Sequence, residues 1–143
     1  MYYTTTHPSD PRLINDIVQA INGEFEAIVC YEQLSKLAPT DDTRNQILEI
    51  RNDEIRHYNQ FSQIYTSITG LTPTPQYPKN CPTDYRAGIQ SAFKDEQETV
   101  DFYHRISERA NNPHISIPFQ RAAADEQNHA VWFLFFLTSS SKD

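Results

Sequence analysis

Apolar residues recur at steps of three and four along four long stretches of the chain. This spacing places them on one face of an α-helix. The pattern predicts helices at about 11–38, 41–69, 83–110 and 113–138. Four amphipathic helices of similar length predict an all-α four-helix bundle, because their apolar faces can close around one shared core.

Proline and glycine separate the predicted helices. Pro39 ends the first, and Gly70 suits the left-handed conformation that closes the second. Residues 71–82 contain four prolines and form a linker that spans about 40 Å when extended. A bundle helix is about 42 Å long, so this linker can run the length of the bundle. The sequence therefore predicts two antiparallel hairpins joined by a crossover, with the second and third helices parallel. Pro118 must lie in the first turn of the fourth helix or bend it.

Each predicted helix carries one or two ionisable residues in the middle of its apolar face. The face of the second helix reads Ile47, Ile50, Glu54, His57, Phe61, Ile64, Ile68 and Leu71. The other three faces hold Glu24, Glu96, and Glu126 followed by His129. A buried carboxylate without a partner is costly or takes up a proton. Since no Lys or Arg lies on these faces, a metal cation is the simplest compensation.

The two halves of the chain repeat each other at a shift of 72 residues, the distance from Glu24 to Glu96. The superimposed pairs are Glu24 and Glu96, Tyr31 and Tyr103, Asp53 and Asp125, Glu54 and Glu126, and His57 and His129. Glu and His three residues apart share one helix face. Two such pairs and two further glutamates are typical of di-iron or di-manganese carboxylate sites in helix bundles. The alternative is a bundle whose core acids hold no metal.

Composition and charge exclude several function classes. The chain of 143 residues has 12 Lys and Arg against 19 Asp and Glu and no basic run, which disfavours nucleic acid or an anionic membrane as partner. Its three scattered glycines exclude a glycine-rich nucleotide loop. Cys30 and Cys81 form no C-x-x-C motif, so we expect no disulfide framework, with Cys30 buried and Cys81 exposed. No signal-peptide or bilayer-spanning pattern is visible, and we expect one cytoplasmic domain over 1–143.

These motifs resemble those of the ferritin-like superfamily, and within it the rubrerythrin-like and bacterioferritin-like proteins. The resemblance spans about residues 11–138 and is carried by the blocks 24–31, 53–57, 96–103 and 125–129. It implies a ferritin-like four-helix bundle that holds two iron ions, with two manganese ions or a mixed pair as alternatives. The implied ligands are Glu24 and His57 for one ion, Glu96 and His129 for the other, and Glu54 and Glu126 as bridges between them.

The chain departs from those relatives in three ways. No carboxylate lies one turn from Glu96, where rubrerythrin has an additional acid, and the sequence contains no four-cysteine iron site. Ile55 stands where bacterioferritin has its haem-binding methionine, so no haem is expected. No fifth helix is predicted, so we do not expect a storage shell.

Asp53 and Asp125 directly precede the implied bridging glutamates. In related bundles such an aspartate accepts the N–H of a histidine on a neighbouring helix and so orients the ring. We therefore pair Asp53 with His129 and Asp125 with His57. The alternative is a solvated aspartate on the helix surface.

Tyr31 and Tyr103 lie two turns beyond the glutamates of the first and third helices. They predict a hydrogen bond to a ligand carboxylate or a one-electron donor, and the alternative is a core tyrosine bonded elsewhere. Glu26 and Glu98 also repeat but point away from the buried face, so we expect surface acids. Arg56 lies off the same face, and we expect it to pair with an acid on another helix.

Residues and resemblance together predict a di-metal oxidoreductase that reduces O2 or H2O2, or a ferroxidase, with an electron donor that the sequence does not name. Two alternatives stay open: a non-catalytic iron-binding or structural bundle, and an oxygenase acting on an organic substrate. The run 131–137 is apolar all round the fourth helix. The linker or a second subunit must cover its outer side, and we expect a homodimer.

Overall fold

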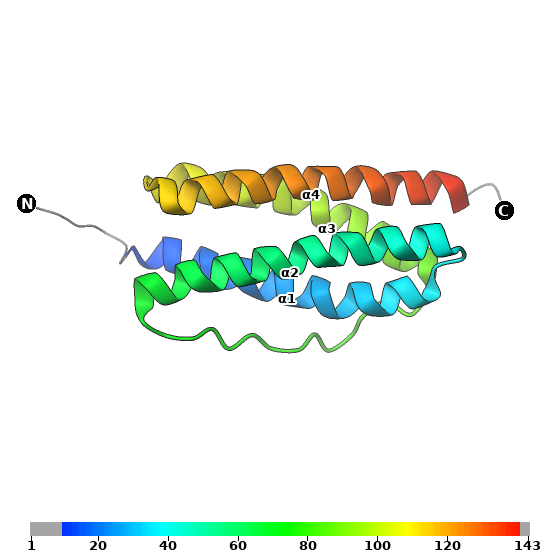
Figure 1. Ribbon diagram of the computed structural model, residues 1–143, viewed down its shortest axis with the longest axis horizontal. Coiled ribbons are helices and arrows are strands. Elements are labelled where there is room, and N and C mark those ends of the chain that lie inside the picture. The colour runs from blue at the N-terminus through cyan, green and yellow to red at the C-terminus, as the bar shows by residue number, and fades with distance from the viewer. Residues whose placement is uncertain (1–9, 141–143) are drawn as a thin grey trace, which may run out of the picture.

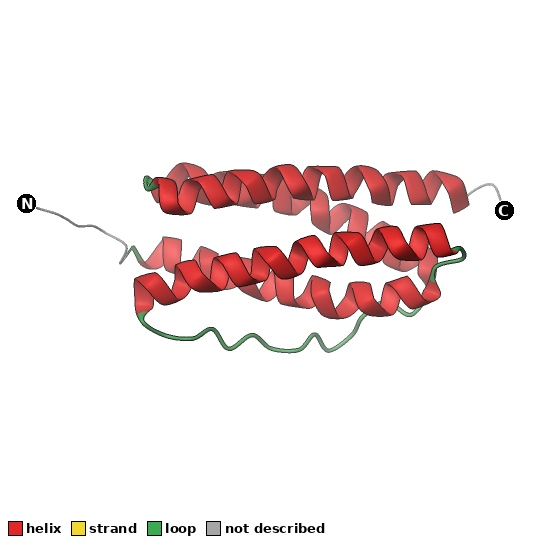
Figure 2. Ribbon diagram, viewed as in Figure 1, coloured by secondary structure: helices red, strands yellow, loops and turns green. Residues whose placement is uncertain are grey.

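Four helices make up almost all of residues 10–140, the part of the chain that the computed structural model describes (Figure 1). The helices are α1 (Pro11–Leu37), α2 (Asp41–Thr69), α3 (Tyr85–Ala110) and α4 (Pro113–Ser140). Figure 2 shows helices and loops but no strand in this part of the chain. The predicted all-α four-helix bundle is confirmed.

Short polar residues and a glycine set the helix ends. Asp10, Thr40 and Asp84 each accept a hydrogen bond of 2.9–3.1 Å from a backbone N–H in the first turn of their helix. Gly70 closes α2 with φ of 74°, the left-handed conformation that glycine adopts without a steric cost. α4 begins at Pro113 and continues through Pro118, which lies beyond its first turn.

The linker after α2 produces the predicted crossover. In Figure 1 it runs from one end of the bundle to the other outside the first hairpin, so α2 and α3 point in the same direction. α1 packs against α2 and α3 against α4 within the hairpins, while α1 faces α3 and α2 faces α4 between them. The two hairpins are therefore related by an approximate two-fold axis, as the sequence repeat requires.

Two apolar clusters fill the bundle, one towards each end. Ile17, Phe61 and Phe119 belong to the first, and Ile50 and Phe133 to the second. The ionisable residues of the helix faces lie between the clusters and are buried. One predicted core residue, Leu71, is 60% exposed, because α2 ends at Thr69 and Leu71 already belongs to the linker.

A disulfide joins Cys30 of α1 to Cys81 of the linker, with Cα atoms 5.2 Å apart. The expectation of no disulfide was wrong, and both residues are half-buried rather than one buried and one exposed. The 50 residues between them give no local signal of this pairing. The pair meets only because the crossover brings the end of the linker back to α1.

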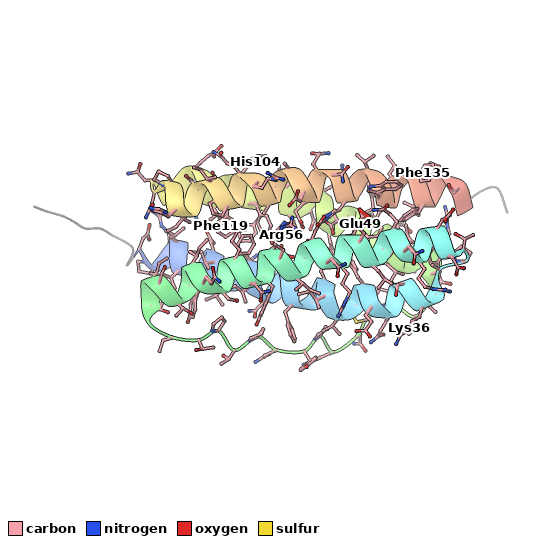
Figure 3. The ribbon with its side chains drawn as sticks, in the orientation of Figure 1. Lys36, Glu49, Arg56, His104, Phe119 and Phe135 are labelled. Carbon is pink, nitrogen blue, oxygen red and sulfur yellow. A yellow bond between two sulfur atoms is a disulfide. The ribbon has the colours of Figure 1, made fainter. Side chains whose placement is uncertain are left out.

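The outer side of α4 stays open to solvent. Val131, Leu134 and Phe135 are 58%, 45% and 56% exposed, and Figure 3 shows Phe135 on this helix. The linker passes along the first hairpin and does not cover them. Despite this apolar stretch, no helix within residues 10–140 has the length and apolarity needed to cross a bilayer.

Candidate metal centre

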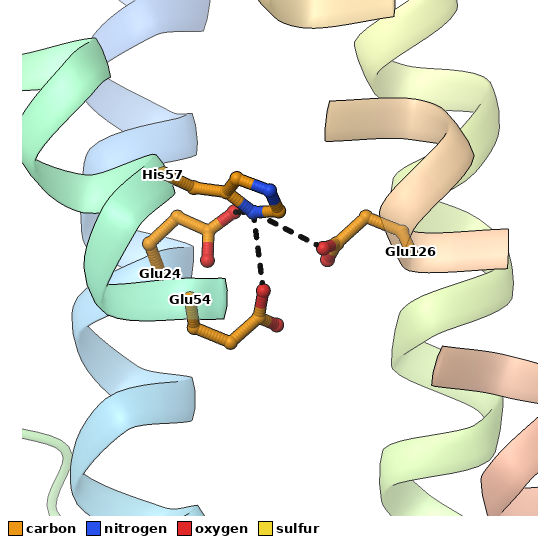
Figure 4. A group of neighbouring side chains, drawn as sticks. All are labelled: Glu24, Glu54, His57 and Glu126. Carbon is orange, nitrogen blue, oxygen red and sulfur yellow. Dashed lines mark ion pairs between the residues drawn. The ribbon is translucent and has the colours of Figure 1, made fainter. Parts of the chain in front are cut away.

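Six ionisable side chains meet in the middle of the bundle, each at most 2% exposed. They form two overlapping groups, in each of which one oxygen or nitrogen atom per residue lies within 4.8 Å of the others. The first group is Glu24, Glu54, His57 and Glu126, drawn in Figure 4, and the second is Glu54, Glu96, Glu126 and His129. Glu54 and Glu126 belong to both groups, which is the position that a bridging carboxylate needs. The structure thus brings together all six predicted ligands.

The helix periodicity explains this convergence. Glu54 and His57 are three residues apart on α2, and so are Glu126 and His129 on α4, so each pair projects from one helix face. α1 and α3 supply one glutamate each from the opposite side of the bundle. The centre therefore receives a contribution from every helix.

His57 turns one ring nitrogen to the centre and the other away from it. Its Nδ1 lies 3.3 Å from Glu24, 3.2 Å from Glu54 and 3.3 Å from Glu126. Its Nε2 lies 2.8 Å from Oδ2 of Asp125 on α4. With the Nε2 proton donated to Asp125, the Nδ1 lone pair is free to bind a cation.

His129 repeats this arrangement in the second half. Its Nδ1 lies 3.3 Å from Glu96, and its Nε2 lies 2.8 Å from Oδ2 of Asp53 on α2. Both predicted aspartate–histidine pairs are therefore present. Each one ties α2 to α4 and fixes the direction in which an imidazole faces.

Arg56 closes the bundle on the α2–α4 side (Figure 3). Its guanidinium lies 2.9 Å from Asp53 on its own helix and 2.9 Å from Asp125 on α4, as predicted for a partner on another helix. Burial alone would raise the pKa of Asp53, but hydrogen bonds from His129 and Arg56 hold it below its ordinary value. The aspartate thus stays ionised and keeps accepting the histidine proton.

The two tyrosines cross between the halves of the repeat. The hydroxyl of Tyr31 on α1 donates to Oε2 of Glu96 on α3 at 2.6 Å, and Tyr103 on α3 donates to Oε2 of Glu24 on α1 at 2.5 Å. The predicted hydrogen bonds to the central carboxylates are present. Burial raises the pKa of both phenols well above the ordinary value, and the neighbouring carboxylates raise it further, so both stay protonated donors.

Without a cation, the centre binds protons. Burial raises the pKa of Glu54 and Glu126 well above the ordinary value, and the charges of neighbouring glutamates raise it further. Burial would lower the pKa of His129, but contact with Glu96 raises it to about 9. Burial would likewise lower the pKa of His57, and Glu126, Glu24 and Glu54 raise it instead. The imidazolium ions and protonated carboxyls take the place of the missing positive charge.

The donor set fits two metal ions. Oε1 of Glu24, Oε1 of Glu54, Nδ1 of His57 and Oε2 of Glu126 are buried, and although they lie close together they form no hydrogen bond with one another or with any other group. Buried polar atoms are normally paired, so four unpaired atoms at one point indicate a missing ligand. Carboxylate oxygens with imidazole nitrogens suit iron or manganese, and each of the two groups can hold one ion.

A cavity of about 1040 Å³ connects this centre with the outside between α1 and α3. The linker contributes to its wall, and so do Cys30 and Cys81. Neither this cavity nor Asp95 beside it was foreseen from the sequence. The only available signal was that the repeat places acids at matching outward positions, Glu26 and Glu98, which are indeed exposed.

Comparisons with known proteins agree with this geometry. The family model described as Rubrerythrin matches residues 88–143. Uncharacterized protein YhjR of Bacillus subtilis (strain 168) is 53% identical over 135 residues, which cover 94% of this chain and 93% of that protein. A hypothetical protein from Pyrococcus furiosus has a similar solved structure, with a TM-score of 0.77 and 18% identity over 91% of this chain and 90% of that one. This last similarity concerns the fold alone.

Proposed function

Because the chain belongs to the rubrerythrin family of ferritin-like proteins, we propose that it binds two iron ions and reduces O2 or H2O2 at its buried centre. The observation that carries this proposal is the pair of buried carboxylate and imidazole groups contributed by all four helices, four atoms of which have no hydrogen-bond partner. In this assignment Glu24 and His57 hold one ion and Glu96 and His129 the other. Glu54 and Glu126 bridge the two.

An iron pair bound there would supply the two electrons that reduction of peroxide to water requires. The protein's own residues prepare the centre. Asp125 and Asp53 accept hydrogen bonds from Nε2 of His57 and His129, so that Nδ1 of each imidazole faces the centre. Tyr31 and Tyr103 each hold one carboxylate oxygen with a phenolic proton, which leaves the second oxygen free to bind. The apolar clusters on both sides close the centre towards the two ends of the bundle.

Reduction of peroxide to water consumes two protons. As bridging ligands Glu54 and Glu126 would be deprotonated, so these protons would enter from solvent through the cavity between α1 and α3. The cavity between α1 and α3 is wide enough to admit O2 or H2O2.

The experiment compares wild type with Glu54→Gln/Glu126→Gln, which keeps the side-chain size but removes both bridging charges. Apo protein is loaded anaerobically with Fe(II), its iron is counted by elemental analysis, and H2O2 consumption is followed over repeated cycles of reduction. We expect two ions per chain and continued consumption for wild type only. Slow filling without consumption would indicate a metal-binding bundle instead, and two tightly bound ions in the double variant would overturn the ligand assignment.

We also propose that the protein is a cytoplasmic homodimer. The exposed apolar residues of α4 support a second subunit as their cover. In that reducing compartment Cys30 and Cys81 would be kept as neighbouring thiols, in contrast to the disulfide that the structure contains. Thiol alkylation of freshly lysed cells, followed by mass spectrometry, tests the compartment, and a fully oxidised pair would contradict a cytoplasmic location.

A further inference from the structure

The two open sides of the bundle differ in charge at the level of the metal centre. On the α2–α4 side the guanidinium of Arg56 bridges Asp53 and Asp125, and both aspartates also hold a histidine. A cation that approached from this side would meet a positive charge and a set of carboxylates already engaged. The α2–α4 side is therefore electrostatically unfavourable for incoming cations.

The α1–α3 side has the opposite character. The cavity there reaches inward to Glu24 and Glu96 and outward to the linker. The residues that line it include seven carboxylates but no Lys, Arg or His: Glu24, Glu26, Glu54, Asp95, Glu96, Glu98 and Glu126. A passage lined by one sign of charge between low-dielectric walls concentrates counter-ions.

The seven acids form an outer and an inner set. Glu26, Asp95 and Glu98 are exposed and form the mouth of the cavity. Three carboxylates gathered at one opening repel one another, and a cation that passes between them relieves this repulsion.

The inner set shows that this passage leads to a place where a cation is needed. Oε1 of Glu24, Oε1 of Glu54 and Oε2 of Glu126 are buried without a hydrogen-bond partner, and all three residues line the inner end of the cavity. Exposed acids outside and unpaired acids inside thus lie along a single opening.

We propose that the opening between α1 and α3 is the path by which divalent cations reach the buried centre, and that Glu26, Asp95 and Glu98 at its mouth attract them. Residues of the linker form the outer wall of this path, and the Cys30–Cys81 disulfide attaches the linker to α1 beside it. The inference rests on the proposed function only in requiring that the centre binds divalent metal. It does not require that the centre reduces anything.

The test is the rate at which apo protein takes up Co²⁺, followed by stopped-flow absorbance at low ionic strength. The variant Glu26→Gln/Asp95→Asn/Glu98→Gln removes the three mouth charges. The control Asp42→Asn/Glu49→Gln/Glu108→Gln removes three exposed charges from residues that do not line the cavity. Both variants change the net charge equally, so the comparison isolates position from total charge.

We expect uptake by the mouth variant to slow about tenfold, within the range of electrostatic steering. The deficit should shrink as salt is added, because salt screens exposed charges. The final stoichiometry of two ions and the metal-induced rise in melting temperature should match wild type. The control should stay within about twofold of the wild-type rate.

Four results would overturn the proposal. If the mouth variant takes up Co²⁺ at the wild-type rate, cations reach the centre by another path. If the control variant is slowed equally, the slower uptake is due to the change in net charge and not to the position of the acids. Loss of stoichiometry would make the mouth acids ligands rather than a path. If wild type itself binds no Co²⁺, Mn²⁺ or Fe²⁺, the proposed function and the path both fail, whereas normal binding without a rate effect removes the path alone.

Discussion

The hydroxyl of Tyr103 on α3 donates a hydrogen bond of 2.5 Å to Glu24 on α1, a residue of the other half of the repeat. The equivalent bond runs from Tyr31 to Glu96 at 2.6 Å. Each half of the molecule therefore orients the carboxylate of the other. A change in one phenol should be felt at the ion that the opposite half is proposed to hold.

Replacement of Tyr103 by Phe keeps the buried ring but removes this bond, and Glu24 then loses its fixed orientation. We expect the affinity for one of the two metal ions to fall about tenfold. This is the lower end of the loss usually seen when a residue that holds a metal ligand in place is mutated. Chelator competition that resolves two binding constants is the measurement. Tyr65→Phe, a change in the apolar cluster away from the centre, is the control. An equal loss for both ions would contradict the cross-half assignment.

The double variant Glu54→Gln/Glu126→Gln should affect apo and metal-loaded protein in opposite ways. Both carboxyls have raised pKa values because they are buried beside other acids, so neutral amides should leave apo protein at pH 8 at least as stable as wild type. The same change should abolish the stabilisation by added metal. Thermal melting with and without chelator tests both effects, and a strongly destabilised apo variant would refute this account.

The melting curves should also depend on pH in a defined direction. The pKa of His129 is raised to about 9, so its stabilising contribution to apo protein is complete below its unfolded pKa and is lost as pH rises through 9. The raised pKa values of Glu54 and Glu126 act in the same direction, because ionisation in the folded state is unfavourable.

Metal competes with these same protons, so its stabilising effect should grow from pH 5 to pH 9. At the acid end, the lowered pKa values of Asp53 and Glu96 mean that their ionised forms stabilise the folded protein. This stabilisation is lost as pH falls below the ordinary carboxyl range. The difference in melting temperature between metal-loaded and chelator-treated protein, measured across this range, provides the test. A constant difference would contradict proton competition.

The sequence predicted what repeats along a helix and missed what depends on the path of the chain. Glu54 and His57 could be placed on one buried face because three residues make nearly one helical turn. The crossover could be predicted because the length and prolines of the linker match the length of the bundle. The meeting of Cys30 with Cys81 could not be, because it depends on where the linker lies in space and no spacing rule records that.

Leu71 shows the same limit at a helix end. Its step of three from Ile68 continues the apolar pattern, but the helix has already closed at Gly70 and the residue is exposed. The cavity likewise follows from how α1, α3 and the linker pack. The sequence signals it only through two acids at its mouth, Glu26 and Glu98, which occupy equivalent positions in the repeat.

Reduction of the Cys30–Cys81 disulfide should destabilise the protein. The bond closes a loop with a sequence separation of 51 residues, and the chain-entropy model assigns such a loop about 4 kcal/mol of stabilisation. Urea unfolding with and without reductant measures the difference. Cys30→Ala/Cys81→Ala should resemble the reduced wild type and show no response to reductant. Equal unfolding midpoints for oxidised and reduced wild type would indicate that the linker is already fixed by its packing.

The outer side of α4 is the expected dimer interface. Val131, Leu134 and Phe135 are spaced by three and four residues and lie exposed on one face of the helix. Burying such a face is favourable by about 25 cal/mol for each Å² of apolar surface, so we expect a dimer at micromolar concentrations, observed by sedimentation. Phe135→Glu should yield a monomer with unchanged metal content, because the centre lies inside one chain. Ile117→Glu, at an equally exposed residue near the other end of α4, should leave the dimer intact. A monomeric wild type, or a dimer that only Ile117→Glu disrupts, would show that this face is not the interface.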